Sequence, residues 1–372
     1  MGLLAATGCV TAQPALKDAF QGKFLIGAAL NESQFTGQNA MQTALVKKHF
    51  NTITPENVLK WEKVHPELNR FDFGPSDAYV AFGETNEMFI IGHTLVWHSQ
   101  TPDWVFTDAN GNPVTREVLL QRMHDHIFSV VGRYAGRIHG WDVVNEALAD
   151  DGTLRDTPWR KIIGDDYLVK AFEFAHAADP KAELYYTDYC LENEPKRSGA
   201  AVLVKKLLAA GVQLTGVGSQ GHVNLEWPLA AEEEATISAF GNLGLKVMIT
   251  ELDVDMLPKA DASQSADVSR RAAANAALNP YADGLPAVQQ QALAQRYAEL
   301  FAVYLKHSDV VTRVTFWGVT DDDSWLNGWP VAGRTSYPLL FDRAGKPKPA
   351  FDKVLETAHP EKSGKKLTAV NY

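Results

Sequence analysis

Short apolar or aromatic runs alternate with longer amphipathic stretches along most of the chain. Runs of this kind predict buried strands, and the stretches between them show the three- and four-residue spacing of helices. The eight runs are residues 24–30, 52–54, 89–97, 138–145, 183–189, 216–222, 246–252 and 313–319. Strands that alternate with helices predict a parallel sheet, because each helix crosses back between neighbouring strands.

Three of the amphipathic stretches carry clear helical signals. Residues 119–134 follow Thr115, a good N-cap, and residues 293–304 repeat the same apolar spacing. A third helix is expected over residues 202–210, because Gly211 suits the position after a helix end. Eight strand–helix pairs predict a single (β/α)8 TIM barrel, although a doubly wound open sheet gives a similar alternation.

Polar and aromatic residues stand at the carboxyl ends of nearly all the predicted strands, and this placement favours the barrel. In a barrel those ends converge on one face, where catalytic loops lie, whereas in an open sheet they spread along a line. The residues are Glu56, Asn57, Trp97, His98, Asn145, Glu146, Asp188, Tyr189, Gln220, His222, Glu251, Asp253 and Trp317.

One connection is longer than the usual loops of a barrel. Residues 258–286 follow the seventh predicted strand, and residues 269–278 within them are expected to be helical. A loop of this length is either functional or a small helical excursion. We expect residues 1–19 to form an N-terminal lead, residues 20–358 the barrel, and residues 359–372 a polar tail.

Composition narrows the class of protein. Of the 372 residues, 45% are hydrophobic and 22% are charged, and no apolar run approaches the roughly 20 residues that span a bilayer. The net charge of −10 disfavours nucleic acid, whose phosphates need a cationic surface. Several of the 9 Trp residues stand beside polar residues at strand ends, where flat apolar faces suit a neutral sugar. Such a ligand needs no metal or cofactor, and we expect neither.

The two cysteines, Cys9 and Cys190, lack metal-ligand spacing and predict neither a zinc site nor a disulfide framework. Cys190 is expected to be a small buried hydrophobe. Residues 3–9 resemble the tail of a bacterial lipoprotein signal, although the basic segment that precedes a signal core is missing. We expect a secreted or periplasmic protein, with lipid anchoring through Cys9 or a trimmed sequence start as alternatives. Nothing in the sequence requires more than a monomer.

Two apolar strands end in a glutamate, and this pair is the main candidate for chemistry. Residues 141–146 read Trp-Asp-Val-Val-Asn-Glu and end in Glu146, and residues 247–253 carry Glu251. Semi-apolar surroundings favour the protonated carboxyl group that a general acid requires. Glycoside hydrolysis uses two facing carboxyl groups, about 5 to 5.5 Å apart in retaining enzymes and about 6.5 to 9.5 Å apart in inverting ones. An isolated Asn-Glu is more often only a polar strand end.

These two segments resemble the active-site signatures of the family ten glycoside hydrolases, chiefly endo-xylanases. Five further segments agree with the family in order, namely residues 27–29, 54–61, 92–98, 216–222 and 317–321. The resemblance covers about residues 24–351. It implies endo-acting hydrolysis of β-1,4-xylosidic bonds in xylan and xylo-oligosaccharides by a retaining double displacement.

The resemblance also implies a role for each matching residue. Glu251 would attack the anomeric carbon, while Glu146 would protonate the departing oxygen and then act as base, a coupled titration. Asn145 would hydrogen-bond the sugar 2-hydroxyl. His222 would contact Glu251, with Asp253 orienting its other ring nitrogen.

The family's substrate contacts map onto further positions. Glu56, Asn57 and Lys60 match residues that hold the sugar two units to the non-reducing side. The others are His93, Trp97 and Gln100 around the cleaved sugar, Trp317 and Trp325 as aromatic walls, Tyr189 on the leaving-group side, Gln220 as a further contact, and His98 in support. The sequence departs from the family at residues 187–190, Thr-Asp-Tyr-Cys, where Asn-Asp-Tyr-Asn is common, so two amide side chains are lost.

Two other classes of function remain as alternatives. A non-catalytic carbohydrate-binding barrel would use the same Trp-lined cleft without needing both carboxylates. A phosphate-handling barrel would need a Gly-rich loop and a helix N-terminus after strands seven and eight. The sequence instead has Asp253, Asp255 and residues 321–323, all aspartates, in that region.

Overall fold

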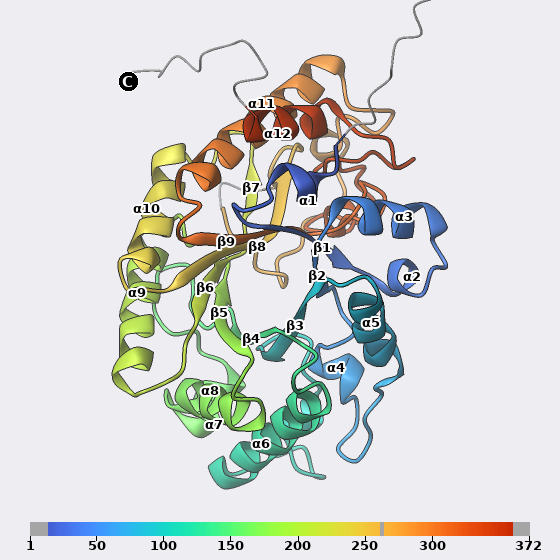
Figure 1. Ribbon diagram of the computed structural model, residues 1–372. Helices are drawn as coiled ribbons and strands as arrows, with labels where there is room; N and C mark the ends of the chain where they lie inside the picture. The colour runs from blue at the N-terminus through green and yellow to red at the C-terminus, as the bar shows by residue number, and fades with distance from the viewer. Residues whose placement is uncertain (1–13, 261–263, 360–372) are drawn as a thin grey trace, which may run out of the picture.

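The computed structural model describes residues 14–260 and 264–359, and Figure 1 looks along a ring of strands surrounded by helices. The ring strands are β1 (Leu25–Leu30), β2 (Thr52–Pro55), β3 (Phe89–Val96), β4 (Gly140–Asn145), β5 (Glu183–Asp188), β6 (Gly216–Ser219), β8 (Lys246–Asp255) and β9 (Val311–Phe316). All neighbours in the ring pair in parallel, and β6 pairs with β8 while β9 pairs with β1. The ring is therefore closed, which confirms the predicted (β/α)8 barrel and excludes the open sheet.

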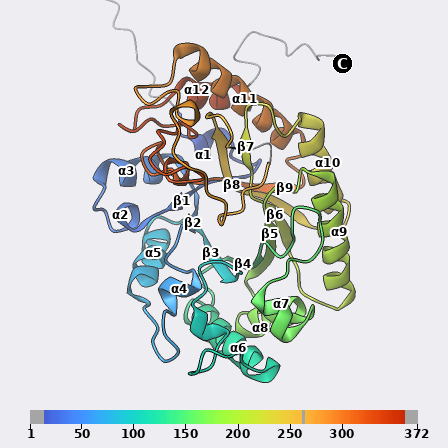
Figure 2. The ribbon, with the colours of Figure 1, turned by 180° about the vertical axis from the view of Figure 1, so that it is seen from behind.

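The helices form an outer layer around the strands, as the view from behind also shows (Figure 2). They are α1 (Leu16–Ala19), α2 (Glu32–Phe35), α3 (Ala40–His49), α4 (Trp61–Val64), α5 (Gly74–Thr85), α6 (Arg116–Arg133), α7 (Pro158–Ile163), α8 (Tyr167–Ala178), α9 (Glu194–Ala209), α10 (Ala230–Gly241), α11 (Ala287–Lys306) and α12 (Pro349–Ala358). The three predicted helices correspond to α6, α9 and α11. The Thr115 hydroxyl caps α6 by accepting the Val118 N–H at 3.4 Å, as its N-cap position predicts.

The sixth predicted strand, residues 216–222, is two strands in the structure. β6 ends at Ser219, and after Gln220 and Gly221 the short β7 (His222–Asn224) pairs with the far end of β8. Gly221 has φ of +81°, and a Cβ there would lie 2.8 Å from the Ile249 side chain. Only glycine combines that backbone angle with such a close approach, so the chain turns away from the barrel wall at this residue.

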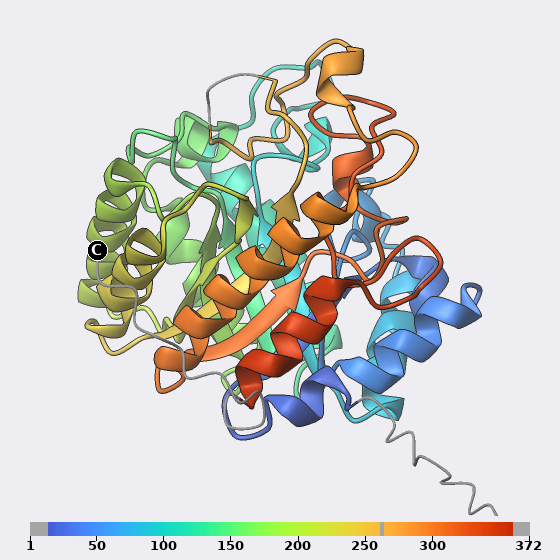
Figure 3. The same ribbon diagram turned by 90° about the horizontal axis from the view of Figure 1, so that it is seen from above.

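The prediction of a helix over residues 269–278 is wrong. Within this stretch the structure has only a 3-10 turn at Ala276–Leu278. The side chain of Asp267 accepts the Ser269 N–H at 2.9 Å, and that of Asn275 accepts the Ala277 N–H at 2.9 Å. Such local bonds compete with helical hydrogen bonds. The connection after β8 rises beyond the heads of the strand arrows, at the carboxyl end of the barrel (Figure 3).

The N-terminal lead and the C-terminal tail remain mostly predictions. Within the expected lead, α1 packs on the barrel, and Leu16 is fully buried in the core. Cys9, the expected anchor site, and residues 360–372 of the expected tail lie outside the described residues. None of the helices in residues 14–260 and 264–359 has the length and apolar character that a bilayer crossing requires. Cys190 is buried, as predicted.

Candidate active site

A cavity of about 320 Å³ lies at the carboxyl ends of the strands. It is lined by thirteen of the residues singled out from the sequence, namely Glu56, Asn57, Lys60, His93, Trp97, Gln100, Asn145, Glu146, Gln220, His222, Glu251, Trp317 and Trp325. They come from six of the eight barrel strands or the loops that follow them. The structure therefore brings both glutamates and almost the whole predicted substrate-binding set into one cleft.

Glu146 follows the last residue of β4 and is buried. Its Oε2 accepts the indole N–H of Trp97 at 2.9 Å, and its Oε1 accepts the side-chain N–H of Gln220 at 3.0 Å. Burial raises the pKa of Glu146, and the charges of Asp188 and Glu251 raise it further, while the two hydrogen bonds oppose the shift. The carboxyl group is thereby biased toward the protonated form that a general acid needs.

Glu251 lies within β8 and belongs to a chain of charges. Its Oε2 lies 3.2 Å from Nε2 of His222, and Nδ1 of the same ring lies 3.1 Å from Oδ1 of Asp253. Burial lowers the pKa of His222, but the charge of Asp253 and the hydrogen bonds with both carboxylates outweigh it and raise this pKa to about 10. At neutral pH the ring is therefore an imidazolium between two carboxylates. The indole N–H of Trp325 completes the chain by donating to Asp253 at 2.7 Å.

Gln220 connects the two glutamates. Its side chain donates to Glu146, and its backbone carbonyl accepts the N–H of Glu251 at 2.7 Å. Gln220 directly follows β6, which lies beside β8 in the ring. Gln220 thus contacts the carboxyl group of Glu146 and the backbone of Glu251, and the charge of Glu251 raises the pKa of Glu146.

A buried lysine, Lys60, lines the same cleft. Lys60 Nζ donates to Gln100 Oε1 at 2.8 Å and to Asn57 Oδ1 at 3.3 Å, and lies 5.1 Å from the centre of the Trp97 ring. Burial lowers the pKa of Lys60, whereas the charges of Glu251, Glu56 and Glu146 raise it. A cation surrounded by carboxylate and amide oxygens suits the hydroxyl groups of a sugar, which both donate and accept hydrogen bonds.

His93 is oriented by a residue that the sequence reasoning did not single out. Its Nδ1 lies 2.9 Å from Oδ2 of Asp142 on β4, and the Thr187 hydroxyl donates to the other oxygen of Asp142 at 3.0 Å. The ring of Trp317 packs against His93 with 5.5 Å between ring centres. The sequence did offer a signal for this role of Asp142, because it is a charged residue within an otherwise apolar strand. A buried carboxylate needs a partner.

Three of the predicted residues lie outside the cleft lining. Asp253 lies 3.1 Å from Nδ1 of His222, and His98 is half-buried, with its pKa lowered by burial to about 4. Tyr189 is 0% exposed and does not present its ring to the cavity. The cavity is instead completed by Ser99, Ala266, Val268 and Arg271. The last three belong to the long connection after β8, whose length was the only signal for them.

Comparison with known proteins places this arrangement in a family. The profile of glycosyl hydrolase family 10 matches residues 15–357. The chain belongs to glycosyl hydrolase family 10. The resemblance drawn from the seven sequence segments is thereby confirmed.

Family 10 relatives align over almost the whole chain. Endo-1,4-beta-xylanase A of Xylanibacter ruminicola is 46% identical over 344 residues, which are 92% of this chain and 93% of the relative. Beta-1,4-xylanase of Dictyoglomus thermophilum is 42% identical, covering 92% and 91%. Among solved structures, a GH10 endoxylanase from a sugarcane soil metagenome superposes with a TM-score of 0.90 at 44% identity, covering 92% and 99%. A mutant structure in complex with xylotriose gives a TM-score of 0.83 at 35% identity, covering 92% and 100%.

Proposed function

We propose that this family 10 protein hydrolyses β-1,4-xylosidic bonds within xylan and xylo-oligosaccharides with retention of configuration. The observation that carries the proposal is the pair of buried carboxyl groups on either side of Gln220. Glu146 has a raised pKa, and Glu251 contacts an imidazolium. The relatives named as xylanases and the xylotriose complex support the choice of substrate.

In the first step, a carboxylate oxygen of Glu251 forms a bond to the anomeric carbon as the bond from that carbon to the leaving oxygen breaks. Glu146 gives its proton to this oxygen, and Asn145 is placed to bond the sugar 2-hydroxyl. The imidazolium of His222 orients the attacking carboxylate. Lys60, Glu56 and Asn57 hold the sugars on the non-reducing side.

In the second step, Glu146 removes a proton from water, the water oxygen bonds to the anomeric carbon, and Glu251 departs as a carboxylate. Glu146 changes from acid to base because the ester on Glu251 carries no charge. The negative charge that raises the pKa of Glu146 in the free enzyme is then absent, so its pKa falls at this stage.

Alanine variants of the two glutamates test the roles on 4-nitrophenyl β-xylobioside, whose leaving group departs without protonation. Glu146→Ala should reduce turnover of xylan by about 10²- to 10⁴-fold, the usual contribution of general acid–base catalysis. Added azide should then yield β-xylobiosyl azide, because this anion attacks the ester on Glu251 without a base. Glu251→Ala should lose activity on both substrates and give no β-azide.

The matched control is Glu183→Ala, which removes a strand glutamate at the amino end of β5, across the barrel from the cleft. It should keep activity on both substrates. Near-native xylan turnover by either Glu146→Ala or Glu251→Ala would disprove the role assignment. Binding of xylan by the wild type with no new reducing ends would favour the non-catalytic barrel instead.

Secretion or periplasmic export, the monomeric state and the lack of nucleic acid binding belong to the same proposal. Export rests on residues 3–9 and the lack of nucleic acid binding on the net charge of −10, while nothing in the sequence requires more than a monomer. Cell fractionation and gel filtration test the first two directly.

A further inference from the structure

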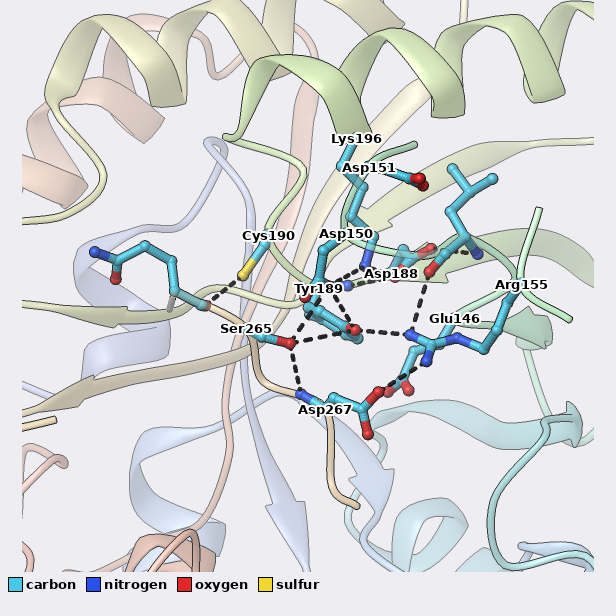
Figure 4. Close-up of polar contacts among 12 residues, drawn as sticks. Glu146, Asp150, Asp151, Arg155, Asp188, Tyr189, Cys190, Lys196, Ser265 and Asp267 are labelled. Carbon is cyan, nitrogen blue, oxygen red and sulfur yellow. Dashed lines mark hydrogen bonds and ion pairs between the residues drawn. The ribbon is translucent and has the colours of Figure 1, made fainter. Parts of the chain in front are cut away.

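Residues 264–272 are called the covering segment below, and Figure 4 shows two of them, Ser265 and Asp267, beside Tyr189 and Arg155. Arg155, in the loop after β4, pairs with Asp267 at 2.8 Å, and both side chains are less than one fifth exposed. The Ser265 hydroxyl lies 3.3 Å from Oδ1 of Asp150. At the end of the segment, the Ala272 N–H donates to the Pro330 carbonyl at 2.9 Å. The segment is thus tied to the barrel from several sides.

The covering segment contacts Tyr189, the aromatic residue expected on the leaving-group side, because Ser265 Oγ lies 3.5 Å from the Tyr189 hydroxyl. The Tyr189 hydroxyl donates to Asp150 at 2.8 Å and accepts from Arg155 at 2.7 Å, and its ring carries Lys196 Nζ 3.2 Å from its centre. These contacts leave the ring fully buried. It therefore cannot stack on a sugar while these contacts and that with Ser265 hold.

Cys190, where the sequence departs from the family pattern, contacts the covering segment. The thiol of Cys190 contacts the backbone carbonyl of Gln264, with 2.7 Å between sulfur and oxygen. An asparagine, common in the family here, is longer by an amide group and would extend toward the backbone of the segment. A small side chain at residue 190 thus permits the close approach of the covering segment.

The inner side of the covering segment closes the cleft on the leaving-group side. A general acid must contact the glycosidic oxygen, so the leaving group lies beyond Glu146, on the side away from Lys60. That side is formed by the loops after β4 and β5, over which the segment lies. Ala266, Val268 and Arg271 of the segment line the catalytic cavity.

We propose that the covering segment determines leaving-group length in this enzyme, an inference that rests on the proposed function. In the position described, it lines the cavity and is held by its ion pair with Arg155, and so favours short leaving groups. A longer xylan chain on this side requires the Arg155–Asp267 ion pair to open and the segment to move off Tyr189. Removing the ion pair should therefore favour long substrates over short ones.

Asp267→Asn tests the inference, because asparagine keeps an oxygen for the Ser269 N–H and removes only the charge. The measured quantity is kcat/KM for xylohexaose divided by kcat/KM for 4-nitrophenyl β-xylobioside, whose leaving group is one ring. We expect this ratio to rise at least threefold. Glu84→Gln, which removes the carboxylate paired with Arg137 outside the cleft, is the matched control and should leave the ratio unchanged.

Cys190→Asn provides a second, independent variant and should raise the ratio in the same direction. Hydrogen exchange adds a readout that does not depend on turnover. Amides of residues 264–272 in Glu251→Gln should exchange faster when xylohexaose is bound, and should not do so with xylobiose. The inference would be overturned if the kcat/KM ratio were unchanged in Asp267→Asn or in Cys190→Asn, provided that the variant folds. Slower exchange of the amides of residues 264–272 with xylohexaose would also overturn it. A wild-type protein that hydrolyses neither substrate would instead refute the proposed function.

Discussion

The hydrogen bond from Trp97 to Glu146 opposes the protonated state that the general acid needs. The indole N–H is a donor only, and it stabilises the ionised carboxylate at 2.9 Å. Trp97→Phe removes this donor and keeps an aromatic ring under Lys60. We therefore expect the pKa of Glu146 to rise further in this variant, and the basic limb of the pH–activity profile to move to higher pH.

The size of the shift follows from the strength of the bond. A hydrogen bond to a charged group contributes about 1.5 to 3 kcal/mol, and one pKa unit corresponds to about 1.4 kcal/mol. Glu146 is buried, so solvent screens the loss weakly, while Gln220 continues to donate to the other oxygen. We expect a shift of about one to two pH units.

The assay is kcat/KM against pH on xylotetraose, because its limbs report ionisations of the free enzyme. Any weakening of sugar contacts by the smaller ring lowers the whole curve without moving its limbs. Trp61→Phe is the control, since the indole N–H of the buried Trp61 has no acceptor among the described residues. A basic limb that stays in place or moves to lower pH in Trp97→Phe would refute the reasoning.

Three further predictions concern stability. A Cβ on Gly92 would lie 2.1 Å from the Trp141 ring inside the barrel, so Gly92→Ala should destabilise the fold by about 3 kcal/mol or prevent folding. Gly132→Ala, where a Cβ meets nothing within 4 Å in helix α6, should stabilise it by about 0.5 to 1 kcal/mol in urea titrations. Because the pKa of His222 is raised from 6.5 to about 10, its stabilisation is complete below pH 6.5 and is lost as pH rises toward 10. The melting temperature should therefore fall more between pH 7 and 10 in the wild type than in Asp253→Asn, and equal falls would contradict the assignment.

The barrel could be predicted because its strands are buried on both faces and so appear as apolar runs. The cleft could be predicted for a related reason, since Glu146 and Glu251 interrupt such runs at the carboxyl ends. The sequence did not reveal that the sixth strand breaks at Gly221. A glycine between two polar residues is compatible with one continuous strand and with two separate strands. Only the packing of Gly221 against Ile249 reveals it.

The leaving-group side could not be predicted from local patterns. The contacts around Tyr189 include Ser265 directly and Asp267 through Arg155, and both come more than 70 residues later in the chain. The alanine-rich residues 269–278 suggested a helix by propensity, which carries little weight where no apolar face is buried. Side-chain bonds from Asp267 and Asn275 to the backbone decide the conformation there instead.

The short strand β7 keeps His222 and Asp253, the two residues behind Glu251, aligned when the rest of the loop after β6 changes. Its ladder places His222 directly opposite Asp253, so backbone pairing aligns the two side chains. Insertions or deletions beyond Asn224 can thus accumulate during evolution without separating imidazole from carboxylate. Loss of a single residue between Ser219 and His222 would have the opposite effect, because a one-step slip turns every side chain of a strand to its other face.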